Sequence, residues 1–471
     1  MIDPQDAIAQ YDEGLVLNNQ GKYNDAIQMF DKAIKINPQF AEAWMYKGNA
    51  LYNQYEYDKA IQAYDKAIEI NPKYVWAWNS KGDALKNLGK FDEAILAYDK
   101  AIELNPQFAE AWGNKGNALY KQHKYDEAIQ AYDKAIEINP KYAWAWTEKG
   151  LALANQRKYA EAIQAYDRAI EIVPRYAWAW NNKGDILYNQ HKYDEAIQAY
   201  DKAIEINPQF AEAWINKGNI LYNQHKYDEA IQTYDKAIEI VPQYARAWNS
   251  KGDALYNQYK YDEAILAFDK AIEINPQFAE AWNGKGNALY KQHKYDDAIQ
   301  VYDKAIKINP QLFVAWFNKG AIHLRRFENE EAYTCFDKAT EINPKSAEAW
   351  YNKGFILNDN REYDEAIKAY SKAIDLNPQL ITAWIRMGDA LDKLGDYHES
   401  IEVFDKLIQI DPHNATPWCR KSYIFKRMGK YLPAILCYIK AIKTDPFSFA
   451  EPFIETFLEL SAAEIESKIK R

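Results

Sequence analysis

The chain has 471 residues, too many for one ordinary globular core, and its 58 basic and 68 acidic residues give a net charge of −10. This balance disfavours a general nucleic-acid or anionic-membrane surface, and no apolar run is long enough to span a membrane. The three cysteines form no CxxC pair and the start, MIDPQDAIAQ, lacks a secretory signal pattern, so we expect a cytoplasmic protein.

The sequence repeats itself with a period of 34 residues. A glycine, a proline and a tryptophan recur in phase along the chain, starting from Gly14, Pro38 and Trp44. Thirteen repeats fill residues 7–448, after a lead-in of residues 1–6. A fixed period of this length indicates a stacked array of small units rather than a globular domain.

Each repeat is predicted to fold as two helices. In the second repeat the first helix is expected over residues 42–54, because apolar residues such as Trp44 and Leu51 keep helical spacing. Asp58 suits the N-cap of the second helix, which should end before Pro72 because proline disfavours helical geometry in the preceding residue. One helix pair cannot bury both of its apolar faces, so neighbouring repeats must stack.

This pattern resembles the tetratricopeptide repeat. Its signature is matched in the second repeat by Trp44, Gly48, Ala60 and Pro72, with Tyr64 where the family usually has Phe. The resemblance covers all thirteen repeats. It implies an all-α fold, an α-solenoid superhelix of tandem helix-turn-helix repeats, whose first helices line a concave groove.

A lysine stands in the apolar stripe of the first helix, where the family usually has leucine. Lys47 recurs along the chain, and an aspartate sixteen residues before it, Asp31, recurs with it. The two disappear together at Ser371 and Met387. We predict that each aspartate forms an ion pair with the lysine of the next repeat and fixes the stacking geometry. The alternative is that both residues recur only because the repeats arose by duplication, without forming a pair.

The side of the first helix that faces away from the core is expected to line the groove. Asparagine amides there can hold a peptide backbone, and tryptophans outside the repeat signature are hot-spot candidates. The candidates in the first seven repeats are Tyr52, Trp76, Asn117, Tyr120, Trp144, Trp178, Asn182, Asn219 and Tyr222. Two alternatives stay open. The recurrence of asparagine at the same positions of successive repeats can reflect recent duplication, and the extra tryptophans can cover junctions between repeats.

The last four repeats, residues 313–448, differ from the others. Their groove face adds the candidates Phe317, Arg325, Tyr351, Arg386 and Arg420. The thirteenth repeat carries seven basic residues against one acidic residue, a charge of 7 − 1 = +6. One interpretation is a docking site for an acidic or carboxylate-bearing peptide. The other, which we slightly prefer, is that terminal repeats have drifted because they cap the stack. Residues 449–471 lose the repeat pattern and are predicted to form a capping helix.

No residue pattern indicates catalysis, a metal or a cofactor. His123 and its counterparts share one turn position and are spread along the array, so we expect solvated loop residues. We therefore predict a non-enzymatic scaffold whose groove binds peptide segments of other proteins, with no cofactor, nucleic acid, membrane or small-molecule substrate. The alternative is an adaptor or regulatory subunit that recruits an acidic partner or a separate enzyme through residues 313–448.

Overall fold

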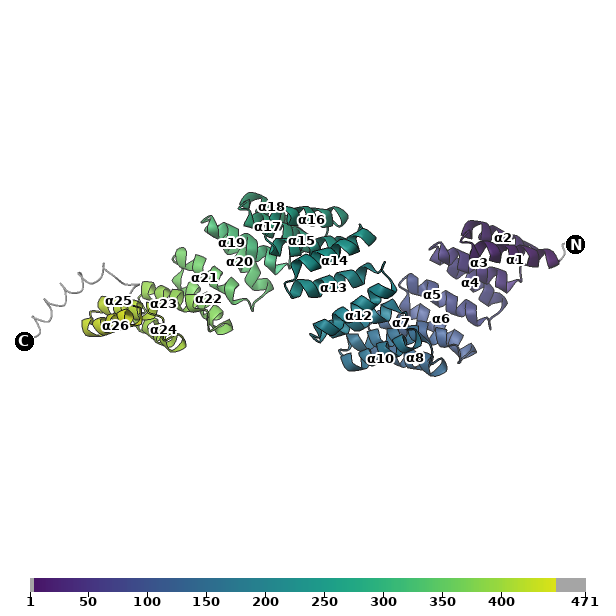
Figure 1. Ribbon diagram of the computed structural model, residues 1–471, viewed down its shortest axis with the longest axis horizontal. Coiled ribbons are helices and arrows are strands. Elements are labelled where there is room, and N and C mark those ends of the chain that lie inside the picture. Colours follow the sequence, from purple (N-terminus) through teal and green to yellow (C-terminus); the bar gives the residue numbers. More distant parts are fainter. Residues whose placement is uncertain (1–3, 446–471) are drawn as a thin grey trace, which may run out of the picture. The chain divides into compact units, whose positions relative to one another are not determined.

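The computed structural model describes residues 4–445, which form α-helices arranged in consecutive pairs with no β-strand (Figure 1). The helices are α1 (Pro4–Asn19), α2 (Tyr23–Ile36), α3 (Ala41–Asn53), α4 (Tyr57–Ile70), α5 (Val75–Asn87), α6 (Phe91–Leu104), α7 (Ala109–Lys121), α8 (Tyr125–Ile138), α9 (Ala143–Asn155), α10 (Tyr159–Ile172), α11 (Ala177–Asn189), α12 (Tyr193–Ile206), α13 (Ala211–Asn223), α14 (Tyr227–Ile240), α15 (Ala245–Asn257), α16 (Tyr261–Ile274), α17 (Ala279–Lys291), α18 (Tyr295–Ile308), α19 (Phe313–Arg325), α20 (Asn329–Ile342), α21 (Ala347–Asp359), α22 (Tyr363–Leu376), α23 (Ile381–Leu394), α24 (Tyr397–Ile410), α25 (Thr416–Arg427) and α26 (Tyr431–Thr444). Each repeat contributes an odd-numbered helix and then an even-numbered one, which is the fold of an α-solenoid. The predicted capping helix, residues 449–471, lies outside the described residues.

The chain divides into two compact halves. The N-terminal half ends at Pro242 and the C-terminal half begins at Gln243, which is close to the boundary between α14 and α15. Within each half, every helix packs against the next one along the chain. The apolar core is therefore distributed along the stack, as successive small clusters, instead of gathered in one centre.

A glycine in each of the first twelve repeats lets the paired helices approach closely. A Cβ atom at Gly82 of α5 would lie 2.5 Å from the ring of Tyr98 in α6, and Gly48 and Tyr64 repeat this arrangement. The ring that occupies this place is almost completely buried in every such repeat: Phe30, Tyr64, Tyr98, Tyr132, Tyr166, Tyr200, Tyr234, Phe268, Tyr302, Phe336, Tyr370 and Phe404. Any larger side chain at the glycine would push the two helices apart.

The tryptophan of the repeat signature packs between neighbouring repeats, as expected for the predicted α-solenoid. Trp112 contacts three apolar clusters, which contain Ala101, Leu119 and Ala135. Its indole Nε1 donates a hydrogen bond of 3.2 Å to the carbonyl oxygen of Pro106. Most repeats make the same bond, which ties the tryptophan to the turn that precedes its own helix.

The observed bounds of α3 and α4 agree closely with those predicted from the sequence, but the predicted N-cap of α4, Asp58, is wrong. Helix α3 runs over Ala41–Asn53 and α4 over Tyr57–Ile70, so Asp58 lies inside the first turn of α4, and its N-cap, Glu56, makes no side-chain bond. The first-turn aspartates of other even-numbered helices instead accept a bond from a glutamine of the next repeat. Asp92 binds Gln122 in this way at 2.9 Å, and the contact recurs in further repeats.

The predicted ion pairs between repeats are confirmed. The pairs that lie within one half are Asp31–Lys47, Asp65–Lys81, Asp99–Lys115, Asp133–Lys149, Asp167–Lys183, Asp201–Lys217, Asp269–Lys285, Asp303–Lys319, Asp337–Lys353 and Asp405–Lys421. In the first of them Lys47 Nζ lies 2.6 Å from Asp31 and 5.2 Å from the centre of the Trp44 ring. The lysine stem can therefore sit in an apolar stripe because its ammonium has both a carboxylate and an aromatic face.

Candidate peptide-binding surface

The odd-numbered helices form the inner layer of each half. Direct contacts between successive odd-numbered helices recur along both halves, as expected for the more crowded side of a curved stack. We define the inner face as the side of these helices that points away from the even-numbered helices. It follows the residue register of Trp76, Asn79, Asp83 and Lys86 in α5.

Many asparagines and tyrosines of the inner face already bind one another. Asn219 accepts a 2.9 Å hydrogen bond from the buried hydroxyl of Tyr234, and Asn49 and Asn287 do the same in their repeats. Another set joins neighbouring repeats: asparagine Nδ2 donates to the tyrosine hydroxyl in the pairs Asn87–Tyr52, Asn155–Tyr120 and Asn223–Tyr188. From the sequence, these amides were expected to bind a ligand, but many of their hydrogen bonds are made within the chain.

The remaining candidates of these rows are also held by neighbours. Asn117 Nδ2 lies 3.4 Å from Glu148 Oε2, and the ring of Tyr222 lies 5.6 Å from that of Tyr227. Asn182 is the exception, because the residue is only 7% exposed and its Nδ2 atom has no hydrogen-bond partner. Of the asparagine candidates, this one has a buried donor left unused.

Two of the three extra tryptophans are exposed on the inner face. The Trp76 side chain is 51% exposed and meets the ring of Phe108 edge-on, with centroids 4.6 Å apart. The Trp178 side chain is 41% exposed and stacks on Phe210 at 5.6 Å. In each pair the phenylalanine is the N-cap residue of the next odd-numbered helix, α7 or α13, so the two rings form an aromatic platform between successive odd-numbered helices. Such exposed aromatic area is typical of binding surfaces.

Trp144 instead covers a junction, which is the alternative that the sequence left open. Its ring would lie 2.7 Å from a Cβ atom at residue 113, so the absence of a side chain at Gly113 lets the indole settle against α7. It also meets Tyr132 edge-on and lies 5.5 Å from Tyr142. The residues at the same spacing before the two exposed tryptophans, Trp76 and Trp178, are Met45 and Thr147, which both carry side chains.

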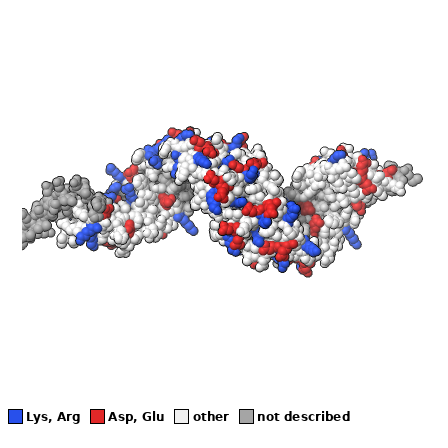
Figure 2. Space-filling view, viewed as in Figure 1, with Lys and Arg blue, Asp and Glu red and all other residues white. Residues whose placement is uncertain are grey.

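Carboxylates accompany the two exposed tryptophans, a feature that the sequence interpretation underrated. Glu110 and Glu212 occupy the same repeat position as Trp76 and Trp178, one repeat later in each case. Burial, and secondarily the negative charge of Asp83, raise the pKa of Glu110, and burial raises the pKa of Glu148. Over the face viewed in Figure 2, acidic and basic side chains are interspersed. The charge around a candidate site must therefore be judged from the residues beside it, not from the net charge of the chain.

In the C-terminal half, the aromatic candidates pack against the solenoid. Phe317 lies 5.6 Å from the ring of Phe336, and Tyr351 lies 6.0 Å from that of Tyr370. Both are only partly exposed.

The basic candidates of this half are exposed, but several have partners. Arg420 Nε lies 3.0 Å from Asp389, and Arg427 makes two 2.9 Å contacts with the carboxylate of Asp392. Arg386 lies over the ring of Phe355 at 5.3 Å, and a hydrogen bond with Tyr290 raises the pKa of Arg325. Part of the positive charge seen in the sequence is therefore neutralised within the chain.

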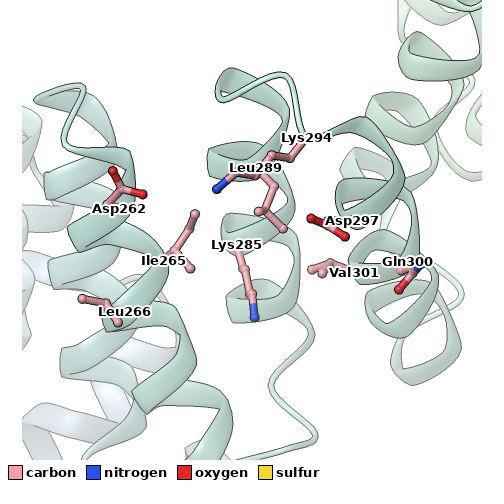
Figure 3. A pocket seen from close by; sticks show the side chains of 9 residues that line it. All are labelled: Asp262, Ile265, Leu266, Lys285, Leu289, Lys294, Asp297, Gln300 and Val301. Atoms are coloured by element: carbon pink, nitrogen blue, oxygen red, sulfur yellow. The ribbon is translucent and has the colours of Figure 1, made fainter.

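The structure contains a groove that was not predicted from the sequence. It has a volume of 590 Å³ and lies between α16, α17 and α18, with Leu266 and Val301 among its lining residues (Figure 3). Lys285 pairs with Asp269, and Asp262 accepts a bond from Gln292. Because these polar groups already join adjacent repeats, we assign no ligand to this groove.

The shared histidines are turn residues. His123 has a φ of 62°, and its Nδ1 lies 2.9 Å from the hydroxyl of Tyr125. Within residues 4–445, no three His, Cys, Asp or Glu side chains are grouped so that they could hold a metal ion. No helix in the described part of the chain combines the length and apolar character needed to cross a bilayer.

Comparison with known proteins identifies the repeat. Models described as tetratricopeptide repeat match residues 3–75, 79–143, 143–176, 181–245, 215–277, 249–312, 347–380, 381–414 and 415–448. Residues 329–359 match the protein prenyltransferase alpha subunit repeat. No curated protein matches the sequence. The crystal structure of the APC/C hetero-tetramer Cut9-Hcn1 has a TM-score of 0.41 and 14% identity to the chain, over 95% of both. Since one of these models alone matches more than half of the sequence, the chain belongs to the tetratricopeptide repeat family, a family of protein-interaction scaffolds.

Proposed function

We propose that the protein is a non-catalytic scaffold that binds peptide segments of partner proteins along the inner face of its N-terminal half. The observation that carries the proposal is the pair of exposed aromatic platforms, Trp76 with Phe108 and Trp178 with Phe210. Large aromatic rings supply much contact area at a small cost in side-chain entropy, and they are frequent hot spots.

The surroundings of the platforms favour a basic, apolar segment. Glu110 lies near the first platform in the repeat register and Glu212 near the second. The aspartates further along the same helices already have partners, since Asp83 pairs with Lys86 and Asp185 accepts bonds from Tyr200 and Asn216. A carboxylate beside an aromatic ring attracts a lysine or arginine, whose stem packs on the ring while its charge is neutralised. A segment that alternates basic and apolar residues fits this face.

The alternative function, recruitment of an acidic partner by the last repeats, has less support. Arg420 and Arg427 are already paired with Asp389 and Asp392, so an acidic peptide would have to displace these carboxylates. Arg386 and Arg325 are the exposed charges left for that role among the candidates.

The test uses peptides selected from a random library against the full-length protein. Their affinities are measured by fluorescence anisotropy for the wild type and for the double variant Trp76→Ala/Trp178→Ala. We expect a loss of at least about tenfold, the usual effect of removing hot-spot residues. Peptides that bind the double variant as tightly as the wild type would contradict the proposal.

Leu96→Ala is the matched control. Leu96 is an exposed apolar residue, 66% accessible, but it lies on the even-numbered helix α6. Its replacement is expected to leave the affinities unchanged. Arg386→Ala/Arg325→Ala tests the alternative, since a loss confined to this variant would place the binding site in the last repeats.

A further inference from the structure

The fifth repeat lacks a tyrosine that its neighbours share. Six other repeats, including both neighbours of the fifth, have this tyrosine near the end of the odd-numbered helix, and its ring packs on a tyrosine that starts the even-numbered helix. The ring centroids are 5.5 Å apart in Tyr120–Tyr125 and 5.8 Å apart in Tyr188–Tyr193. The fifth repeat has Ala154 at this position.

A pocket of 220 Å³ opens where the missing ring would lie. Ala154 of α9, Tyr159 of α10 and Asn189 of α11 are among its lining residues. In the flanking repeats, the counterpart of Asn189 donates a 2.9 Å hydrogen bond to the hydroxyl of the shared tyrosine, as Asn155 does to Tyr120. Tyr159 and Asn189 therefore lack the ring and the hydroxyl that their counterparts contact.

A second departure in the same repeat leaves a buried donor unused. Asn216, the counterpart of Asn182, donates to Asn181 and to Asp185 of the repeat before it. In the fifth repeat Leu151 stands where Asp185 stands in the sixth, and it has no acceptor. As a result Asn182, which lines the pocket and is only 7% exposed, has an Nδ2 atom without a partner.

We propose that this pocket binds the unphosphorylated side chain of a tyrosine in a partner's peptide segment; the proposal rests on the proposed function and names one residue of its ligand. The phenol ring packs on Tyr159, and its hydroxyl accepts a hydrogen bond from Asn189, as the chain's own tyrosines do in the flanking repeats. The buried Nδ2 of Asn182 donates to a carbonyl oxygen of the peptide backbone.

The three groups lie in order along α11 and suit an extended peptide. Trp178, Asn182 and Asn189 follow one another on the same helix, and eleven residues of helix span about 16 Å. About five residues of an extended chain cover that length. One segment can thus place an apolar or basic side chain on Trp178 and a tyrosine in the pocket.

Size and charge select the occupant. A volume of 220 Å³ is below the range of roughly 300–1,000 Å³ usual for small-molecule sites, and it suits a single side chain. Asp185 also lines the pocket, and its carboxylate accepts bonds from Tyr200 and Asn216. A phosphate group beside this carboxylate would be repelled, so the phosphorylated residue is excluded.

The test measures ligand-observed saturation-transfer NMR with the full-length protein and three probes: N-acetyl-tyrosinamide, N-acetyl-phenylalaninamide and phosphorylated N-acetyl-tyrosinamide. We expect transfer to the tyrosine probe, binding that is roughly tenfold weaker for the phenylalanine probe, which lacks the hydroxyl, and no transfer to the phosphorylated one. The absence of transfer to the tyrosine probe, or equal transfer to any two probes, would overturn the proposal.

Variants locate the binding. Ala154→Tyr supplies the missing ring from the chain itself and is expected to abolish the signal, while Asn189→Ala removes the preference for tyrosine over phenylalanine. Lys86→Tyr places the same ring at the corresponding position of the third repeat, outside the pocket, and is expected to keep the signal. A signal that survives Ala154→Tyr refutes the assignment, with circular dichroism confirming that both tyrosine variants fold.

The two proposals fail separately. If the tyrosine probe does not bind but selected peptides still depend on Trp76 and Trp178, the pocket assignment alone is wrong. If the tyrosine probe binds the wild type but not Ala154→Tyr, and no selected peptide depends on the two tryptophans, the pocket assignment is right and the proposed function is wrong.

Discussion

At the scale of the residue, the recurring lysine shows how a charge can occupy an apolar stripe. In the pair Asp201–Lys217 the two atoms lie 2.7 Å apart, with the lysine side chain 23% and the aspartate side chain 50% exposed. Since the carboxylate is half solvated, the pair fixes the position of one repeat on the next more than it adds to stability.

A double-mutant cycle on Asp201 and Lys217 measures this contribution. Thermal unfolding of the two alanine variants and their combination should give a coupling energy of about 0.5–1 kcal/mol, because one partner is half exposed. The matched control is Lys202–Glu205, whose side chains are 54% and 68% exposed on a single helix. Its coupling should be smaller. Equal coupling in the two pairs would show that the contact between repeats has no special role.

Asp253 has lost partners that its counterparts possess. Asp185 accepts bonds from Tyr200 and Asn216, whereas the corresponding positions around Asp253 are occupied by Phe268 and Gly284. Asn249 donates to it at 3.0 Å. Burial raises the pKa of Asp253 from 3.8 to about 7, despite the opposing effect of Asn249.

The raised pKa predicts a definite pH dependence. Between about pH 4 and pH 7 the folded protein keeps a proton on Asp253 that the unfolded chain has released, so this residue's contribution to stability falls as pH rises. Asp253→Asn should therefore raise stability at pH 8 by about 2–4 kcal/mol and have little effect near pH 4.

Thermal unfolding at pH 4 and pH 8 tests the prediction. Asp83→Asn is the matched control, because Asp83 accepts bonds from the Tyr98 hydroxyl and from Asn79. It should give no stabilisation at pH 8. An Asp253→Asn variant that is equally stable relative to wild type at both pH values would contradict the account.

At the scale of the element, the turn after each odd-numbered helix needs a left-handed residue. Gly21, Gly89, Gly395 and Gly429 meet this need, with φ values from 72° to 101°. Other repeats place His, Tyr, Arg or Phe there at φ of 60–68°. The left-handed conformation costs a residue with a side chain roughly 1–2 kcal/mol, so these repeats carry local strain.

Phe327→Gly should relieve this strain. Phe327 has a φ of 62° and is 89% exposed, so its replacement removes little packing. We expect a gain of up to about 1 kcal/mol in thermal unfolding, since the strain relieved exceeds the extra entropy of glycine in the unfolded chain. Arg325→Gly, two residues earlier at the end of α19, should destabilise instead. A loss of stability in both variants would contradict the strain argument.

The elements themselves could be predicted from the sequence because their signals are local. Helical spacing and the Asn–Pro end signal placed α3 and α4 within about one residue of their observed bounds. The aspartate–lysine pairs could be predicted as well, since the two residues disappear together at one junction between repeats, at Ser371 and Met387. Asp58 was wrongly assigned as an N-cap because the suitability of a residue for capping does not reveal which backbone group its side chain reaches.

The binding face was harder to predict because its partners lie in other repeats. The sequence shows that Asn155 and Tyr120 recur, but their hydrogen bond spans 35 residues and depends on how repeats stack. The fate of Trp144 depended on the empty space at Gly113 of the repeat before it. Ala154 and Leu151 looked like ordinary variation, and only the surrounding residues show that they leave a pocket with an unused donor.

At the scale of the whole molecule, the chain devotes most of its recurring polar groups to holding repeats together. Ion pairs and Asp–Gln bonds join neighbouring repeats within each half, and Asn–Tyr bonds do so in the N-terminal half. The surface offered to a partner is then made by the positions that break the pattern. Trp76 and Trp178 stand where five other repeats have glutamate, and Ala154 stands where six others have tyrosine.

Hydrogen–deuterium exchange of the full-length protein, with and without a peptide selected against it, tests the central claim most directly. Binding on the inner face of the N-terminal half should slow exchange in α5, α7, α9, α11 and α13, and leave the intervening even-numbered helices unchanged. Slower exchange confined to the even-numbered helices, or to α19–α26, would contradict the claim that the exposed tryptophans mark the site where partners bind.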